Sequence, residues 1–152
     1  MSSIQPTLKY IKDFTVMGFS IKTQNKDEFN EKKAKLPSLW KQFYSSSLAT
    51  NANIFEVYSN YESDANGIYT VTLGIQDDIK QSDFASVNIQ SGNYLIFQGI
   101  GPMPCTVVDT WKKIWDYFDN DNMYQRSLIS DFESYSVVDQ VDIYIGLKFL
   151  ET

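Results

Sequence analysis

The sequence contains no histidine and only one cysteine, Cys105. Histidine is the commonest metal ligand and general base, and its absence excludes Ser-His and Cys-His nucleophile arrangements. We therefore expect no metal site and no cofactor. A single cysteine cannot form an internal disulfide, which is typical of a protein in a reducing cytoplasm, and we expect that location here.

Basic residues are scarce and long apolar runs are missing. There are 13 Lys and Arg against 19 Asp and Glu, giving a net charge of -6. Because neutralising phosphates requires clustered basic residues, we expect no direct binding to nucleic acid; the cluster at 32–35 is more typical of a solvated helix face. No apolar run approaches the roughly 20 residues of a membrane span, and the first residues lack a signal-peptide pattern, so no membrane association is expected.

Aromatic residues, in contrast, are abundant, with 10 Tyr, 10 Phe and 3 Trp making up 15% of the chain. Such a composition favours a β-rich core, since aromatic side chains are enriched in strands. It is also typical of an aromatic-lined pocket. The number of tyrosines slightly favours the pocket, because a buried tyrosine hydroxyl requires a hydrogen-bond partner.

The length of 152 residues favours a single domain over residues 1–152 with a substantial core. Alternating and helical spacings of apolar residues predict its elements. In order, these are a strand within 8–22, a helix ending before a loop at 45–53, strands at 54–62 and 68–75 joined by a turn at 64–67, a connecting segment at 76–90, a strand at 94–99, a helix at 106–119, and strands at 126–135 and 141–149.

The sequence of the first helix contains candidate capping residues and an internal proline. Asn25 or Asp27 is expected to cap its beginning, since their side chains accept hydrogen bonds from free backbone N–H groups. Pro37 lies within the apolar stripe of the helix. The pattern therefore predicts either a kink at Pro37 or a helix that restarts with Pro37 in its first turn.

Three short matches between the two halves of the chain suggest an internal repeat. We infer pseudo-repeats at about 8–76 and 92–150, each a strand-helix-strand-strand module. The predicted fold is α+β, with antiparallel sheet structure, two main helices, pseudo-twofold symmetry and a cleft between the halves. The matches are Trp40-Lys41 with Trp111-Lys112 and Tyr61-Glu62-Ser63 with Phe132-Glu133-Ser134, both 71 positions apart, and Leu73-Gly74-Ile75 with Ile145-Gly146-Leu147.

The strand at 126–135 carries two carboxylates on one face. Alternation places Ile129, Asp131, Glu133 and Tyr135 together, opposite a face formed by Leu128, Ser130 and Phe132. On an outer face of a sheet this arrangement is ordinary. On an inward face a carboxylate must be paired, protonated or available to a cationic ligand.

Several motifs together resemble those of the GyrI-like or AraC-type effector-binding domain. The resemblance extends from about Leu8 to Phe149, and implies a duplicated strand-helix-strand-strand fold. It also implies similarity to the ligand-sensing domains of multidrug-responsive transcription regulators. The motifs are Val57-Tyr58, Tyr61-Glu62-Ser63-Asp64, Tyr69-x-Val71-x-Leu73-Gly74, Gly92-x-Tyr94-x-x-Phe97, Trp111-x-x-Ile114-Trp115, Asp131-Phe132-Glu133-x-Tyr135 and Asp142-Ile143-Tyr144-Ile145-Gly146.

The resemblance also implies a ligand site. In the family a glutamate of a Phe-Glu motif lies among aromatic residues and binds cationic or hydrophobic compounds, and the matching residue here is Glu133. Trp111 corresponds to the helix tryptophan of the family and Tyr58 to the aromatic residue of its second strand. From strand facing we add Tyr135 and Tyr144 as candidate ligand-binding residues.

Simpler structural roles remain open for these residues. Glu133 could be solvent-exposed or form an ion pair with Arg126 or a lysine, since ionised residues are mostly exposed. Trp111 and Trp115 are one helical turn apart, a spacing more typical of a core. We assign Trp115 to the core and Trp111 to the edge of the pocket.

Three classes of function follow, and the leading one is a stand-alone domain that binds small cationic or amphipathic aromatic molecules. The second is a hydrolase of electrophilic small molecules, in which Glu133 acts as general base. The third is an acidic module that binds a protein partner. The chain shows no helix-turn-helix pattern, so we expect it not to regulate transcription alone. The natural ligand and the oligomeric state stay open.

Overall fold

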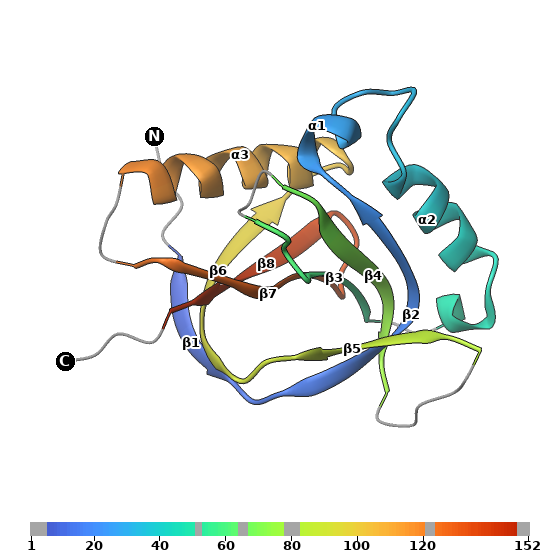
Figure 1. Cartoon of the computed structure of the whole chain (residues 1–152), viewed down its shortest axis with the longest axis horizontal. Coiled ribbons are helices and arrows are strands. Elements are labelled where there is room, and N and C mark those ends of the chain that lie inside the picture. Colours follow the sequence, from blue (N-terminus) through green and yellow to red (C-terminus); the bar gives the residue numbers. More distant parts are fainter. Residues whose placement is uncertain (1–5, 51–52, 64–66, 78–82, 121–123, 149–152) are drawn as a thin grey trace.

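A computed structural model describes residues 6–50, 53–63, 67–77, 83–120 and 124–148 (Figure 1). Within these ranges no helix has the length and apolar composition needed to cross a bilayer. The elements are β1 (Thr7–Ile11), β2 (Phe14–Thr23), α1 (Asn25–Glu28), α2 (Leu36–Tyr44), a short 3-10 helix η1 (Ser47–Thr50), β3 (Ile54–Ser59), β4 (Tyr69–Gln76), β5 (Ala85–Ile89), β6 (Gly92–Ile100), α3 (Cys105–Asn120), β7 (Arg126–Tyr135) and β8 (Gln140–Leu147).

The strands form one eight-stranded antiparallel sheet in the order β1-β6-β8-β7-β3-β4-β2-β5. The sheet is strongly curved, and the three α-helices lie outside the curve (Figure 1). The predicted α+β class with antiparallel strands and two main helices is confirmed. The order also places β6-β8-β7 beside β3-β4-β2 as matching halves, although duplication of the sequence stays a prediction.

Apolar side chains form three clusters, one inside the curved sheet and two beneath the helices. The inner cluster consists of strand residues alone and includes Phe55, Val57 and Phe132. The cluster beneath α2 includes Leu39 and Phe43. The cluster beneath α3 contains Ile114 with β6 and β8 residues. Both faces of the central strands are therefore buried, as in a sheet covered on each side.

The region predicted as the first helix consists of two helices. This agrees with the prediction that a helix restarts with Pro37 in its first turn. α1 ends at Glu28, and α2 begins at Leu36 with Pro37 in its first turn. The Glu28 carboxylate accepts hydrogen bonds from the backbone N–H groups of Lys35 and Leu36, both at 3.1 Å, and so satisfies free donors at the start of α2. The expected cap was wrong, because Gln24 is the N-cap of α1.

Two edge strands depart from the predicted elements. The predicted strand within 8–22 is divided into β1 and β2, and the segment expected to connect at 76–90 contains β5. β1 pairs with β6 and β5 pairs with β2, so each lies at an edge of the sheet. Most residues of these two strands are exposed, which leaves little of the apolar alternation that identifies a strand. Residues 64–66 of the predicted turn and Phe149 lie outside the described residues.

β7 has the predicted bounds but an irregular first half. Leu128 has a positive φ of 56°, and the pairing with β8 shifts between Arg126 and Asp131. Ile129, expected beside Glu133, is consequently 52% exposed. From Ser130 onward the alternation is regular, and both faces are buried.

Candidate functional site

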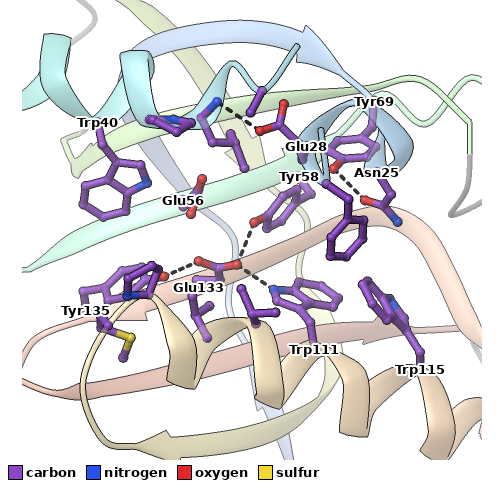
Figure 2. A pocket seen from close by; sticks show the side chains of 18 of the residues that line it. Asn25, Glu28, Trp40, Glu56, Tyr58, Tyr69, Trp111, Trp115, Glu133 and Tyr135 are labelled. Carbon is purple, nitrogen blue, oxygen red and sulfur yellow. Dashed lines mark hydrogen bonds between the residues drawn. The ribbon is translucent and has the colours of Figure 1, made fainter. Parts of the chain in front are cut away.

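A cavity of about 680 Å³ lies on the helix-covered side of the sheet (Figure 2). Its floor is formed by β3 and β7, which pair at the centre of the sheet. Residues of α2 and α3 form walls on opposite sides of this floor, and α1 contributes to the rim. The apolar stripes that hold these helices against the sheet thus also place their aromatic residues around the cavity.

Glu133 lies on the floor and is 1% exposed. Its Oε2 atom accepts hydrogen bonds from the Tyr58 hydroxyl and the Trp111 indole Nε1, both at 2.6 Å. Its Oε1 atom accepts a hydrogen bond from the Tyr135 hydroxyl. Three donors from three elements therefore stabilise this buried carboxylate in the absence of a cation.

The ion pair weighed for Glu133 forms elsewhere. Arg126 Nη2 lies 2.6 Å from Oδ2 of Asp131, whose side chain is fully buried. The Tyr61 hydroxyl and the Gly146 backbone N–H also donate to Asp131. Arg126 is the only cationic residue among the described lining of the cavity, and Asp131 neutralises it. The negative charge of Glu133 is thus left without a cationic partner in the described part of the site.

Glu56, which the sequence analysis missed, lies directly opposite Glu133 across the β3–β7 pairing. It is 3% exposed, and its Oε1 atom is buried without a hydrogen-bond partner. Burial raises the pKa of Glu56 well above its usual value, and the nearby charge of Glu133 raises it further, whereas a contact with the Trp40 indole lowers it. Glu56 therefore holds a proton more readily than an exposed glutamate does.

A signal for Glu56 was present in the sequence. Alternation along Ile54–Ser59 places Glu56 on the same face as Tyr58, a residue already assigned to the pocket. The repeat alignment instead matched Glu62 with Glu133. In the structure Glu62 lies beyond the end of β3, and its side chain is 54% exposed.

Aromatic rings surround the two carboxylates (Figure 2). The Trp111 ring lies 5.4 Å from that of Tyr58 and 6.1 Å from that of Trp115. On the other side, the Trp40 ring lies 5.3 Å from that of Tyr135 in an edge-to-face arrangement. All three tryptophans of the chain line the cavity. Their π faces and the carboxylates together present negative potential to a ligand.

The tyrosines that contact Glu133 stay protonated. Burial raises the pKa of both Tyr58 and Tyr135 well above the usual value, and the charge of Glu133 raises them further. Each hydroxyl therefore remains a hydrogen-bond donor at ordinary pH. The arrangement holds the negative charge of Glu133 firmly in place.

The structure brings four of the five predicted site residues together: Glu133, Trp111, Tyr58 and Tyr135 all line the cavity. Tyr144 does not, because its position in β8 faces the inner cluster, where its ring stacks on Phe132 at 4.3 Å.

Trp115, assigned to the core from its spacing, instead lines the cavity, and its ring lies 6.1 Å from that of Phe29. In the part of the chain that the structure describes, no group of three or more acidic or cysteine side chains could hold a metal ion.

A family model described as "Cass2: Integron-associated effector binding protein" matches residues 7–147. The Bacillus subtilis (strain 168) protein named "Putative transcriptional regulator protein YobU" is 32% identical over 148 residues, covering 86% of this chain and 90% of YobU.

Solved structures show the same fold. The Vibrio cholerae integron cassette protein from the mobile metagenome has 32% identity and a TM-score of 0.85, covering 94% of this chain and 95% of its own. SAV2435, solved bound to tetraphenylphosphonium, has 15% identity and a TM-score of 0.74, covering 95% and 94% of the two chains. At that identity the second likeness concerns the fold alone.

Proposed function

Because the chain belongs to the integron-associated effector-binding protein family, we propose that its cavity binds small organic cations that carry aromatic groups. The observation that carries this proposal is Glu133, a buried carboxylate without a cationic partner among the described residues, at the base of an aromatic cavity. Membership of the family makes the chain an effector-binding domain; the class of its ligand is our inference from the residues.

The physical argument rests on the cost of burying charge. A buried carboxylate loses its hydration, and three neutral donors recover only part of that loss. A cation entering the cavity would recover more through Coulomb attraction in a medium of low dielectric. Each aromatic face adds cation–π attraction of about 0.5–2 kcal/mol, depending on desolvation. Stacking is geometrically permissive, so ligands of varied shape would be accepted.

Two relatives support the proposal without deciding it. SAV2435 shares the fold and was solved with tetraphenylphosphonium, which is an aromatic cation. The name of YobU connects a close sequence relative with transcriptional regulation. With a net charge of -6 the present chain would contact nucleic acid poorly, so a regulatory role would pass through another protein.

The test uses two probes of the same shape and opposite charge, tetraphenylphosphonium and tetraphenylborate. Since all three tryptophans line the cavity, ligand entry should change the intrinsic fluorescence. We expect saturable quenching by the phosphonium and none by the borate at the same concentrations. Equal binding of both ions would show that apolar contacts alone account for binding, and would overturn the proposal.

Hydrolysis, the second class considered, gains no support from the geometry. A general base needs a free lone pair directed at a water molecule. Three of the about four lone-pair sites of the Glu133 carboxylate are already occupied, by donors from Tyr58, Trp111 and Tyr135. The structure likewise offers no observation that favours the protein-interaction module.

A further inference from the structure

We infer that Glu56 is the hydrogen-bond acceptor for the ligand, and that it selects cations bearing an N–H group over quaternary cations that have none. This inference rests on the proposed function and extends it to the class of ligand. It assigns separate roles to the two carboxylates. Glu133 supplies a fixed negative charge, and Glu56 accepts a hydrogen bond from a bound cation that has an N–H group.

The first argument is the hydrogen bonding of Glu133. A carboxylate has about four lone-pair sites, and three of those of Glu133 are already occupied by protein donors. These donors come from Tyr58, Trp111 and Tyr135, which are held by β3, α3 and β7 respectively. A cationic ligand is attracted by the charge of Glu133. Most hydrogen bonds from the ligand to this carboxylate, however, would have to displace a protein donor.

The second argument is the free oxygen of Glu56. Its Oε1 atom is buried, has no hydrogen-bond partner and belongs to a residue that lines the cavity. Buried polar atoms without partners are rare and costly, so a ligand donor that reaches this atom gains more than an ordinary hydrogen bond would give. Figure 2 places Glu56 between Trp40 and Tyr58, above Glu133.

The third argument is the spacing of the two carboxylates. Glu56 and Glu133 are direct partners in the antiparallel pairing of β3 with β7. The Cβ atoms of such partners lie about 4.5–5.5 Å apart. One ammonium group therefore fits against both, attracted by the charge of Glu133 and donating its N–H to Glu56. Trp40, whose ring adjoins Tyr135, would cover the same head group.

The experiment compares two ligands that differ by one methyl group: (biphenylmethyl)dimethylammonium, which has one N–H, and (biphenylmethyl)trimethylammonium, which has none. Both are cations at neutral pH. Dissociation constants are measured by calorimetry on the wild type, Glu56→Met, Glu56→Gln and the control Glu62→Met. Methionine keeps the unbranched shape of glutamate and removes the acceptor. Glu62 is an exposed glutamate outside the cavity lining.

We expect the preference of the wild type for the tertiary over the quaternary cation to fall about tenfold in Glu56→Met, the scale of one hydrogen bond to a charged group. Glu56→Gln should show a smaller fall, because its amide keeps an acceptor, and Glu62→Met none. An unchanged preference in folded Glu56→Met, with melting temperature as the check, overturns the inference. If Glu56→Met does not fold, Glu56→Leu, which also removes the acceptor, takes its place, and an unchanged preference in that variant overturns the inference.

The result also separates this inference from the proposed function. If the wild type binds both cations and the preference is independent of Glu56, the site binds cations but Glu56 does not select them. If the wild type binds neither of these cations nor tetraphenylphosphonium, the proposed function fails, and the inference fails with it.

Discussion

Glu56 and Glu133 lie opposite each other on neighbouring strands, and both side chains are almost completely buried. Two like charges at this separation in a low-dielectric site repel strongly, so the pair is stable only if one member holds a proton. The donors around Glu133 and the raised pKa of Glu56 indicate that Glu56 is this member. The ligand-free pair then carries one net negative charge, on Glu133.

Stability should depend on pH through Glu56. Its pKa in the folded protein is raised above its usual value of 4.5, so the folded state keeps a proton that the unfolded state loses. The stabilisation by this group is therefore complete below about pH 4.5 and is lost as pH rises through the raised pKa. Within that window the free energy of unfolding should fall by about 1.4 kcal/mol per pH unit.

Urea denaturation of the wild type and Glu56→Gln between about pH 5 and about pH 8 measures this effect. The stability of the glutamine variant relative to wild type should increase with pH, since glutamine does not titrate. Glu62→Gln, at an exposed position, serves as the control and should show no such trend. A constant difference between wild type and Glu56→Gln across this range would contradict the account.

Cation binding should release a proton from the site. A cation placed against Glu56 favours its ionised form and so lowers its raised pKa. Affinity should consequently rise with pH over the range in which free Glu56 is protonated. Calorimetric titrations of tetraphenylphosphonium in buffers of different ionisation enthalpy count the protons released. We expect a positive number, up to about one, in wild type and none in Glu56→Gln; equal release in both would assign the proton to another group.

The Arg126–Asp131 ion pair should matter for stability. Asp131 is fully buried, and Arg126→Met leaves its charge without a cationic partner. Breaking a buried pair in this way costs about 3–5 kcal/mol. The exposed pair of Lys22 with Glu62, at 4.0 Å, offers a matched control, and Lys22→Met should change stability by less than about 1 kcal/mol. Urea denaturation checks both values; equal small effects would show that Asp131 is satisfied by its other donors.

The sequence correctly predicted those elements in which apolar residues recur at regular spacing. α3 has a broad apolar stripe, and β7 has apolar residues on both sides of its carboxylates, so their positions followed from residue spacing. The edge strands β1 and β5 bury few side chains and lack such a pattern. Each pairs with a strand that is distant in sequence, β1 with β6 and β5 with β2. No local signal in the sequence encodes such a pairing.

The candidate site was predicted in part, for a related reason. Alternation shows which residues of a strand share a face, but not which face meets the helices. Tyr144 therefore seemed equivalent to Tyr135, yet it faces the inner cluster. Glu56 was missed because its meaning depends on the register between β3 and β7. Trp115 was assigned to the core because helical spacing cannot distinguish a cavity wall from a packed interior.

The most direct test of the central claim is the binding of tetraphenylphosphonium to the wild type and to Glu133→Gln, followed by tryptophan fluorescence. Glutamine keeps the shape of Glu133 and an oxygen acceptor while removing the charge. We expect the variant to stay folded and to bind the cation at least about tenfold more weakly, as for the loss of a charged partner in a desolvated site. Unchanged affinity in the folded variant would show that Glu133 does not attract the ligand, and would contradict the account.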